Sequence, residues 1–179
     1  MRTNLARAAF VVALLAVVGV GSYAMADSGK KNLKADQLGG YQENPDISTV
    51  ANGSFEVTLD DDAQTLSYTL SYTGLEGTVL QAHIHFGKRA VNGGITVFLC
   101  GTAASPGPAG TPTCPQSGTV SRTVQAADIL APGTQGIEAG NFEELVAALR
   151  AGHAYANVHS TKWPGGEIRA QINDEDDND

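Results

Sequence analysis

Apolar and polar residues alternate along much of the chain from residue 53 onward, a pattern typical of β-strands with one buried face. The pattern predicts strands over residues 53–59, 65–73, 78–86, 95–100, 118–124, 154–159 and 167–172. The first two are separated by a turn rich in aspartate and are expected to form a hairpin. The run 95–100 is continuously apolar and is expected to be a central strand, buried on both faces or nearly so.

One segment has the helical period instead. Asn141 is a good N-cap residue, Arg150 and Gly152 mark a helix end, and four apolar residues between them share one face: Phe142, Leu145, Val146 and Leu149. A second, shorter helix is expected around residues 125–130. Many short strands, Gly-rich turns and one clear helix predict an all-β sandwich or barrel with one or two short helices in its crossover loops.

The two ends of the chain differ from this central region in composition. Residues 1–26 combine two arginines, an apolar run and a small-residue cleavage motif, which predicts a secretory signal peptide. The apolar run is shorter than the roughly 20 residues of a membrane span and no second run of that length follows in the sequence, so the mature chain is not expected to insert into a membrane. Residues 27–35 are expected to be a flexible lead, 36–172 the folded domain, and 173–179 an acidic disordered tail.

Charge and cysteine content narrow the choice of partners and compartment. The formal net charge is −8 and becomes −10 without the two arginines, Arg2 and Arg7, of the signal peptide. Without a basic stripe, such a chain is not expected to bind nucleic acid or anionic membrane surfaces. Cys100 and Cys114 are the only cysteines, and an even count in an exported chain predicts a disulfide between them.

All four histidines lie in or beside two of the predicted strands. His83 and His85 occupy the face of strand 78–86 opposite its apolar positions. His153 and His159 occupy the corresponding face of the strand near 154–159. The histidines are therefore expected to lie outside the core, as a cluster at the surface.

This placement suggests a metal site. Same-face neighbours on a strand are roughly 6.6 Å apart, and their imidazoles can tilt together to hold one ion about 2.0 to 2.1 Å from each nitrogen. We expect His83, His85 and His159 to be the ligands of a copper or zinc ion, since imidazole suits both metals. His153 is three same-face steps from His159, roughly 20 Å away by strand rise, and is not expected to share the ion. The alternative is a hydrogen-bonded polar cluster beneath a loop.

Several motifs together resemble the CHRD (chordin) domain family, and in particular its exported microbial members. They are Leu-Gly-Gly-Tyr-Gln-Glu-Asn-Pro at 38–45, Leu-Ser-Tyr at 66–68, Ala-His-Ile-His-Phe-Gly at 82–87, Val-Phe-Leu-Cys at 97–100, Ala-Gly-His-Ala-Tyr-Ala-Asn-Val-His at 151–159 and Pro-Gly-Gly-Glu-Ile-Arg at 164–169. The resemblance implies a Greek-key β-sandwich similar to the Cu,Zn superoxide dismutase fold. In those dismutases a His-x-His strand and a distant histidine hold copper.

Neither the residues nor the resemblance favours an enzyme. Four histidines are too few for the copper and zinc sites of a dismutase, and neither a nucleophile elbow nor a phosphate-binding loop is present. Arg169 has no fixed position near the metal, and Glu167 either orients a histidine or belongs to a structural network.

We therefore expect a secreted or periplasmic protein that binds copper or zinc. The alternative function is a non-catalytic structural or protein-interaction module of the cell envelope or extracellular matrix, with an extracellular protein as its partner. In that case the histidines only pin the loops 87–94 and 160–166.

Overall fold

The computed structural model of the chain describes residues 29–174. Its elements are β1 (Lys30–Gly39), η1 (Gly40–Gln42), β2 (Asn52–Asp60), β3 (Thr65–Thr73), β4 (Val79–Phe86), β5 (Gly94–Gly101), β6 (Gly118–Gln125), η2 (Ala126–Asp128), α1 (Phe142–Arg150), β7 (Ala154–Ser160), β8 (Ile168–Gln171) and β9 (Asn173–Asp174). The predicted signal peptide, 1–26, and positions 175–179 of the predicted tail lie outside the described residues. Among residues 29–174, no helix is long and apolar enough to span a bilayer.

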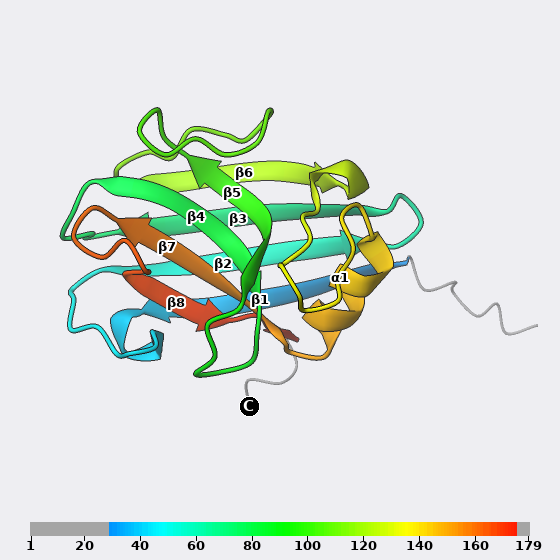
Figure 1. The fold of residues 1–179 in the computed structure, drawn as a ribbon, viewed down its shortest axis with the longest axis horizontal. Coiled ribbons are helices and arrows are strands. Elements are labelled where there is room, and N and C mark those ends of the chain that lie inside the picture. Colours follow the sequence, from blue (N-terminus) through cyan, green and yellow to red (C-terminus); the bar gives the residue numbers. More distant parts are fainter. Residues whose placement is uncertain (1–28, 175–179) are drawn as a thin grey trace, which may run out of the picture.

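The strands form one antiparallel sheet that folds over into two layers. The hydrogen-bonded order is β5-β4-β7-β8-β1-β2-β3-β6, with β9 beside β1. Strands β4, β5, β7 and β8 lie in front of β1, β2, β3 and β6 (Figure 1). The layers meet where Gly39 of β1 pairs with Arg169 of β8. Because β3 pairs with β6 while the intervening β4 and β5 lie in the other layer, the predicted all-β fold with Greek-key connections is confirmed.

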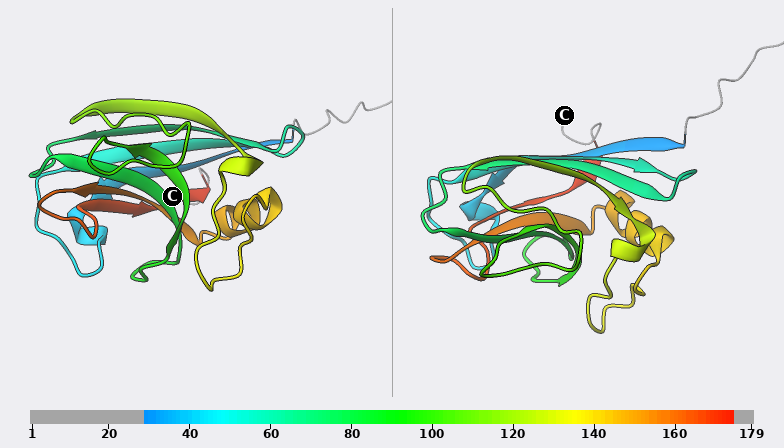
Figure 2. Two further views of the ribbon diagram at one scale, coloured as in Figure 1. Left: turned by 45° about the horizontal axis from the view of Figure 1, so that its top comes forward. Right: turned by 90° about the horizontal axis from the view of Figure 1, so that it is seen from above.

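The alternating apolar residues meet between the two layers. Phe55 and Leu70 of one layer, and Ile84 and Val158 of the other, are fully buried in this core. Helix α1 lies at one end of the sandwich (Figure 2), and the Asn141 side chain accepts a hydrogen bond from the backbone N–H of Glu144, as an N-cap should. The second predicted helix is the single 3-10 turn η2. The disulfide between Cys100 and Cys114 is present.

The prediction of a flexible lead over 27–35 was wrong for its described part. Strand β1 already begins at Lys30, and its Leu33 and Ala35 are buried in the core while Lys34 between them is only partly buried. The predicted tail, 173–179, also begins too early, because Asn173 and Asp174 form β9 and pair with β1. The C-terminal strand β9 of the domain therefore pairs with its N-terminal strand β1.

The predicted central strand, 95–100, was also misplaced. It corresponds to β5, which ends the hydrogen-bonded order instead of lying in its middle. Loop segments satisfy its outer edge: the N–H of Gly101 donates to the carbonyl of Pro112, and the N–H of Leu130 donates to the carbonyl of Thr96. The disulfide attaches the first of these loops to the strand end. Because these loops cover the outer edge of β5, its residues are as apolar as those expected of a central strand.

Candidate metal centre

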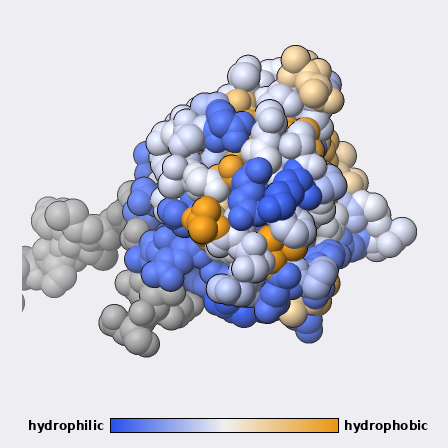
Figure 3. All heavy atoms as spheres, turned by 90° about the vertical axis from the view of Figure 1, so that its left-hand side faces the viewer, coloured by the Kyte–Doolittle hydropathy of each residue, from blue (hydrophilic) through white to orange (hydrophobic). Residues whose placement is uncertain are grey.

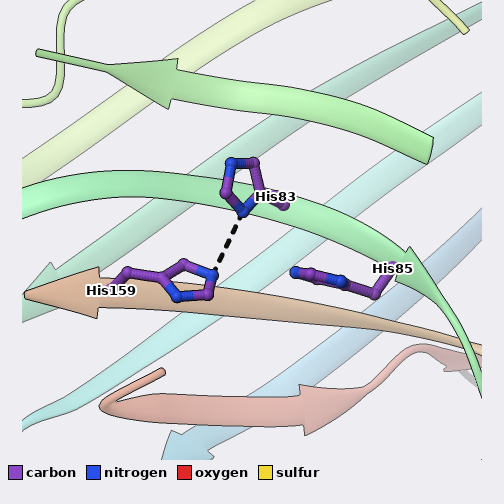
Figure 4. Close-up of side chains that lie close together, drawn as sticks. All are labelled: His83, His85 and His159. Carbon is purple, nitrogen blue, oxygen red and sulfur yellow. Dashed lines mark hydrogen bonds between the residues drawn. The ribbon is translucent and has the colours of Figure 1, made fainter. Parts of the chain in front are cut away.

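Three histidines from two adjacent strands converge on one point. His83 and His85 project from the same face of β4, as the strand period requires (Figure 4). Strand β7 runs antiparallel beside β4 with Asn157 opposite His83, so that His159 lies diagonally across from His83. One ring nitrogen from each histidine lies within 4.8 Å of the others. The structure thus brings together the three residues predicted as ligands.

Strand β5, on the other side of β4, pairs irregularly with it at this site. The register shifts between Ala82 and His83 and again between Ile84 and His85. Irregularities of this kind change the local twist of a strand and the direction of its side chains. The alternation of apolar residues in the sequence carries no sign of them.

The expectation of a surface cluster was wrong, although the histidines do point away from the core. Their exposed fractions are 2% for His83, 8% for His85 and 9% for His159. The ring of Phe98 contacts His83 edge-on, with centroids 4.4 Å apart, and the ring of Tyr155 stacks on His85 at 4.8 Å. The site is a small buried layer between the sheet and the loops outside it.

The covering loops are joined to the histidines by hydrogen bonds. Since a carbonyl oxygen only accepts, the Nδ1–H of His85 donates to Gly93 at 2.9 Å, and the Nδ1–H of His159 donates to Pro164 at 3.1 Å. At the end of the sandwich that carries the loop after β7, the surface is mostly hydrophilic, with apolar residues in separate spots (Figure 3). The carbonyl groups of Gly93 and Pro164 thus hold both covering loops against the histidine rings.

These bonds fix which nitrogens are left with a lone pair. With their protons on Nδ1, neutral His85 and His159 each present an unprotonated Nε2. The Nδ1 of His83 lies 3.1 Å from the Nε2 of His159 and faces the other two rings, while the Nε2 of His83 points away from them (Figure 4). The Nε2 atoms of His83 and His85 are buried with no hydrogen-bond partner among the described residues. At His85, whose Nε2 faces the other two rings, a metal ion would offset the desolvation cost of the unpartnered acceptor.

Burial keeps the three imidazoles neutral. Desolvation lowers the pKa of His83 to about 2, aided by repulsion from His159 and His85. It lowers the pKa of His85 to about 4 despite the bond to Gly93, and it also lowers the pKa of His159. Neutral imidazole is the form that binds a metal, so protons do not compete for these nitrogens at neutral pH.

The polar face continues beyond the histidines onto β8. The guanidinium carbon of Arg169 lies 3.4 Å from the centre of the Tyr155 ring. Because β7 lies between β4 and β8, Tyr155 separates Arg169 from His85. Asn157 donates to the carboxylate of Glu43 at 2.7 Å, and burial raises the pKa of Glu43 to about 7. Arg169 is thus fixed close to the cluster, which the sequence left open.

Glu167 belongs to a structural network. One of its carboxylate oxygens accepts from the Thr49 hydroxyl at 2.9 Å and from the backbone N–H of Glu76 at 2.7 Å. Neither bond reaches a histidine, so of the two alternatives the structural network describes the contacts of Glu167. His153 is exposed and lies outside the cluster, as predicted.

Sequence reasoning missed Phe98 and the two backbone carbonyls that orient the rings. Gly93 and Pro164 lie in loops whose paths the strand pattern does not define, and only the loops as a whole were expected to contact the histidines. One nitrogen from each of three convergent histidines matches the donor set that copper or zinc takes from histidine.

Comparison with known proteins places the chain in a family. The family model of the CHRD domain matches residues 35–172, most of the chain. No curated protein and no solved structure matches it. The match includes both histidine strands and all three clustered histidines, and it agrees with the resemblance carried by the motifs. The chain belongs to the CHRD domain family.

Proposed function

We propose that this CHRD domain is exported and binds one copper or zinc ion through His83, His85 and His159. The observation that supports this most is the convergence of one ring nitrogen from each histidine within 4.8 Å, where the buried Nε2 of His85 has no hydrogen-bond partner among the described residues. Two rings are oriented by carbonyl oxygens, as ligating histidines usually are. Holding or delivering a metal outside the cytoplasm needs only such a site and no catalysis.

Export is supported separately. The N-terminal sequence has the pattern of a secretory signal peptide, and the Cys100–Cys114 disulfide suits an oxidising compartment. A secreted or periplasmic location follows from these two features. Comparing the mass of the protein recovered outside the cytoplasm with that of the full chain tests this part of the proposal, because cleavage after residue 26 leaves a chain beginning at Asp27.

The second candidate is a non-catalytic structural or interaction module with an extracellular protein partner. One observation favours it: His85 and His159 each pin a covering loop through a hydrogen bond, which is a structural role that needs no metal. It leaves the convergence of three ring nitrogens and the unpartnered Nε2 of His85 without an explanation, and for this reason we rank it second.

Metal titration separates the two functions. Elemental analysis and titration with copper and zinc are carried out on the oxidised domain, on His83→Ala/His85→Ala and on His153→Ala as the matched histidine control. We expect roughly one equivalent bound by the wild type and by His153→Ala, and none by the double variant. A folded wild type that binds neither metal would leave the structural module as the remaining function.

A further inference from the structure

The number of ligands and the charge around the histidines bear on which metal ion the site accepts. We infer that the site is built for a cuprous ion, Cu(I), held by three nitrogens, in preference to Zn(II) or Cu(II). This inference rests on the proposed metal binding and adds the charge and coordination number of the ion.

The first argument is the number of ligands. Zn(II) takes four ligands and Cu(II) takes four or more, so a three-histidine site must add water to hold either ion. The cluster contains no carboxylate or thiolate among residues 29–174. The Nε2 atom of His85, which faces the other two rings, exposes less than 1 Å², and the rings of Phe98 and Tyr155 pack against the rings of His83 and His85. Cu(I), a d10 monocation, is satisfied by three nitrogens in a trigonal arrangement.

Burying the charge of a metal ion in this site costs free energy. Desolvation cost rises with the square of the charge, so a dication costs about four times as much as a monocation at the same place. Histidines contribute no negative charge to offset it. Glu43 bonds to Asn157 and not to a histidine, and burial favours its neutral form. A site without a countercharge discriminates against divalent ions more than against a monovalent one.

Arg169 adds to this discrimination. Its guanidinium carbon is 3.4 Å from the Tyr155 ring centre, which is 4.8 Å from the His85 ring centre, so the charge lies within about 8 Å of a ligand ring. Its carbonyl partner on Lys88, at 3.1 Å, keeps it in place. A positive charge at that distance repels a dication more than a monocation by roughly tenfold or more in affinity.

The experiment measures all three ions on the oxidised domain. Cu(I) affinity is obtained anaerobically by competition with bicinchoninate, using ascorbate as reductant to spare the disulfide, while Cu(II) and Zn(II) are measured by equilibrium dialysis. We expect Cu(I) to bind most tightly, by about a hundredfold over Zn(II), with an X-ray absorption edge of three-nitrogen Cu(I). Equal or tighter binding of a divalent ion by the same histidines would overturn the inference and leave metal binding intact. Failure of all three ions to bind would contradict both the preference for Cu(I) and the proposed metal binding.

Two variants test the causes. Arg169→Gln removes the positive charge near the cluster, and Phe98→Ala opens space for water beside His83. Each is expected to raise the affinity for divalent ions relative to Cu(I) by roughly tenfold, whereas Arg150→Gln, at the end of α1, leaves the ratio unchanged. Circular dichroism identifies the variants that fold. A folded Arg169→Gln with the wild-type ratio would contradict the role of the nearby positive charge. A folded Phe98→Ala with the wild-type ratio would contradict the role of water exclusion.

Discussion

The hydrogen bonds of His85 and His159 explain how imidazoles can be packed together with no countercharge. Each ring is held by a backbone carbonyl at Nδ1, which leaves Nε2 facing the cluster. Burial disfavours the charged form of every ring, so the cluster avoids the repulsion that three imidazolium groups would suffer. The same hydrogen bonds point the Nε2 atoms of His85 and His159 toward the other histidine rings (Figure 4).

Gly166 provides a test of packing beside the site. Its φ of +133° suits glycine, and an added Cβ would lie 2.7 Å from Oε1 of Glu43 and 2.8 Å from Nδ2 of Asn157. Gly166→Ala is expected to lower the free energy of unfolding by about 2 kcal/mol or more in urea denaturation. Gly165→Ala is the control, since nothing lies within 4 Å of its Cβ position. Equal stability of the two variants would show that Gly166 is not constrained.

For single residues, the sequence predicts which face of a strand a side chain occupies better than it predicts how deeply that side chain is buried. The strand period was enough to place His83 and His85 on one face and to choose His159 over His153. Burial depends on loops that fold back over that face, and their course is set by contacts distant in sequence, such as the side-chain amide of Asn44 donating to the carbonyl of Ala90 at 3.0 Å. Alternation along one strand contains no information on such contacts.

At the scale of elements, the register of β4 against β7 forms the candidate site. A shift of one residue would turn a strand over and send its histidines into the core, so the buried apolar face also fixes the position of the ligands. Strands β2 to β7 and helix α1 were predicted within one or two residues because each combines a clear period with turn or cap residues. Strand β1 was missed because its apolar positions are few and stand among lysines and other polar residues.

Strand β1 gives a test that separates the structure from the predicted flexible lead. Leu33 has an exposed fraction of 2% and belongs to the core. Leu33→Ala is expected to lower the free energy of unfolding by about 2 to 4 kcal/mol, since it leaves a cavity between the layers. Gln37→Ala, at an exposed position of the same strand, is the control and should change little. A Leu33→Ala variant as stable as the control would mean that the lead does not pack.

The whole molecule should lose stability as the pH falls. The three clustered histidines have lowered pKa values when folded and about 6.5 when unfolded, so below pH 6.5 the unfolded chain binds more protons. Each histidine then removes about 1.4 kcal/mol per pH unit. Glu43 acts in the opposite sense, because its pKa is about 7 when folded and near 4.5 when unfolded.

The net expectation is a loss of about 3 kcal/mol per pH unit between pH 6.5 and 4.5 in the metal-free protein. Urea denaturation at a series of pH values measures it. His83→Gln should reduce the slope by about a third to a half, since it removes one of the titrating rings. A free energy of unfolding that stays constant over this range would show that the histidines are not buried as neutral groups.

The proposed metal ion lies between His83, His85 and His159 in the folded protein. The most direct measurement is anomalous scattering at the metal absorption edge from crystals of the oxidised domain grown with one equivalent of copper or zinc. The account predicts a single peak between His83, His85 and His159, about 2.0 to 2.1 Å from one nitrogen of each ring. No peak at the cluster, or a peak only at exposed groups such as His153, would contradict it.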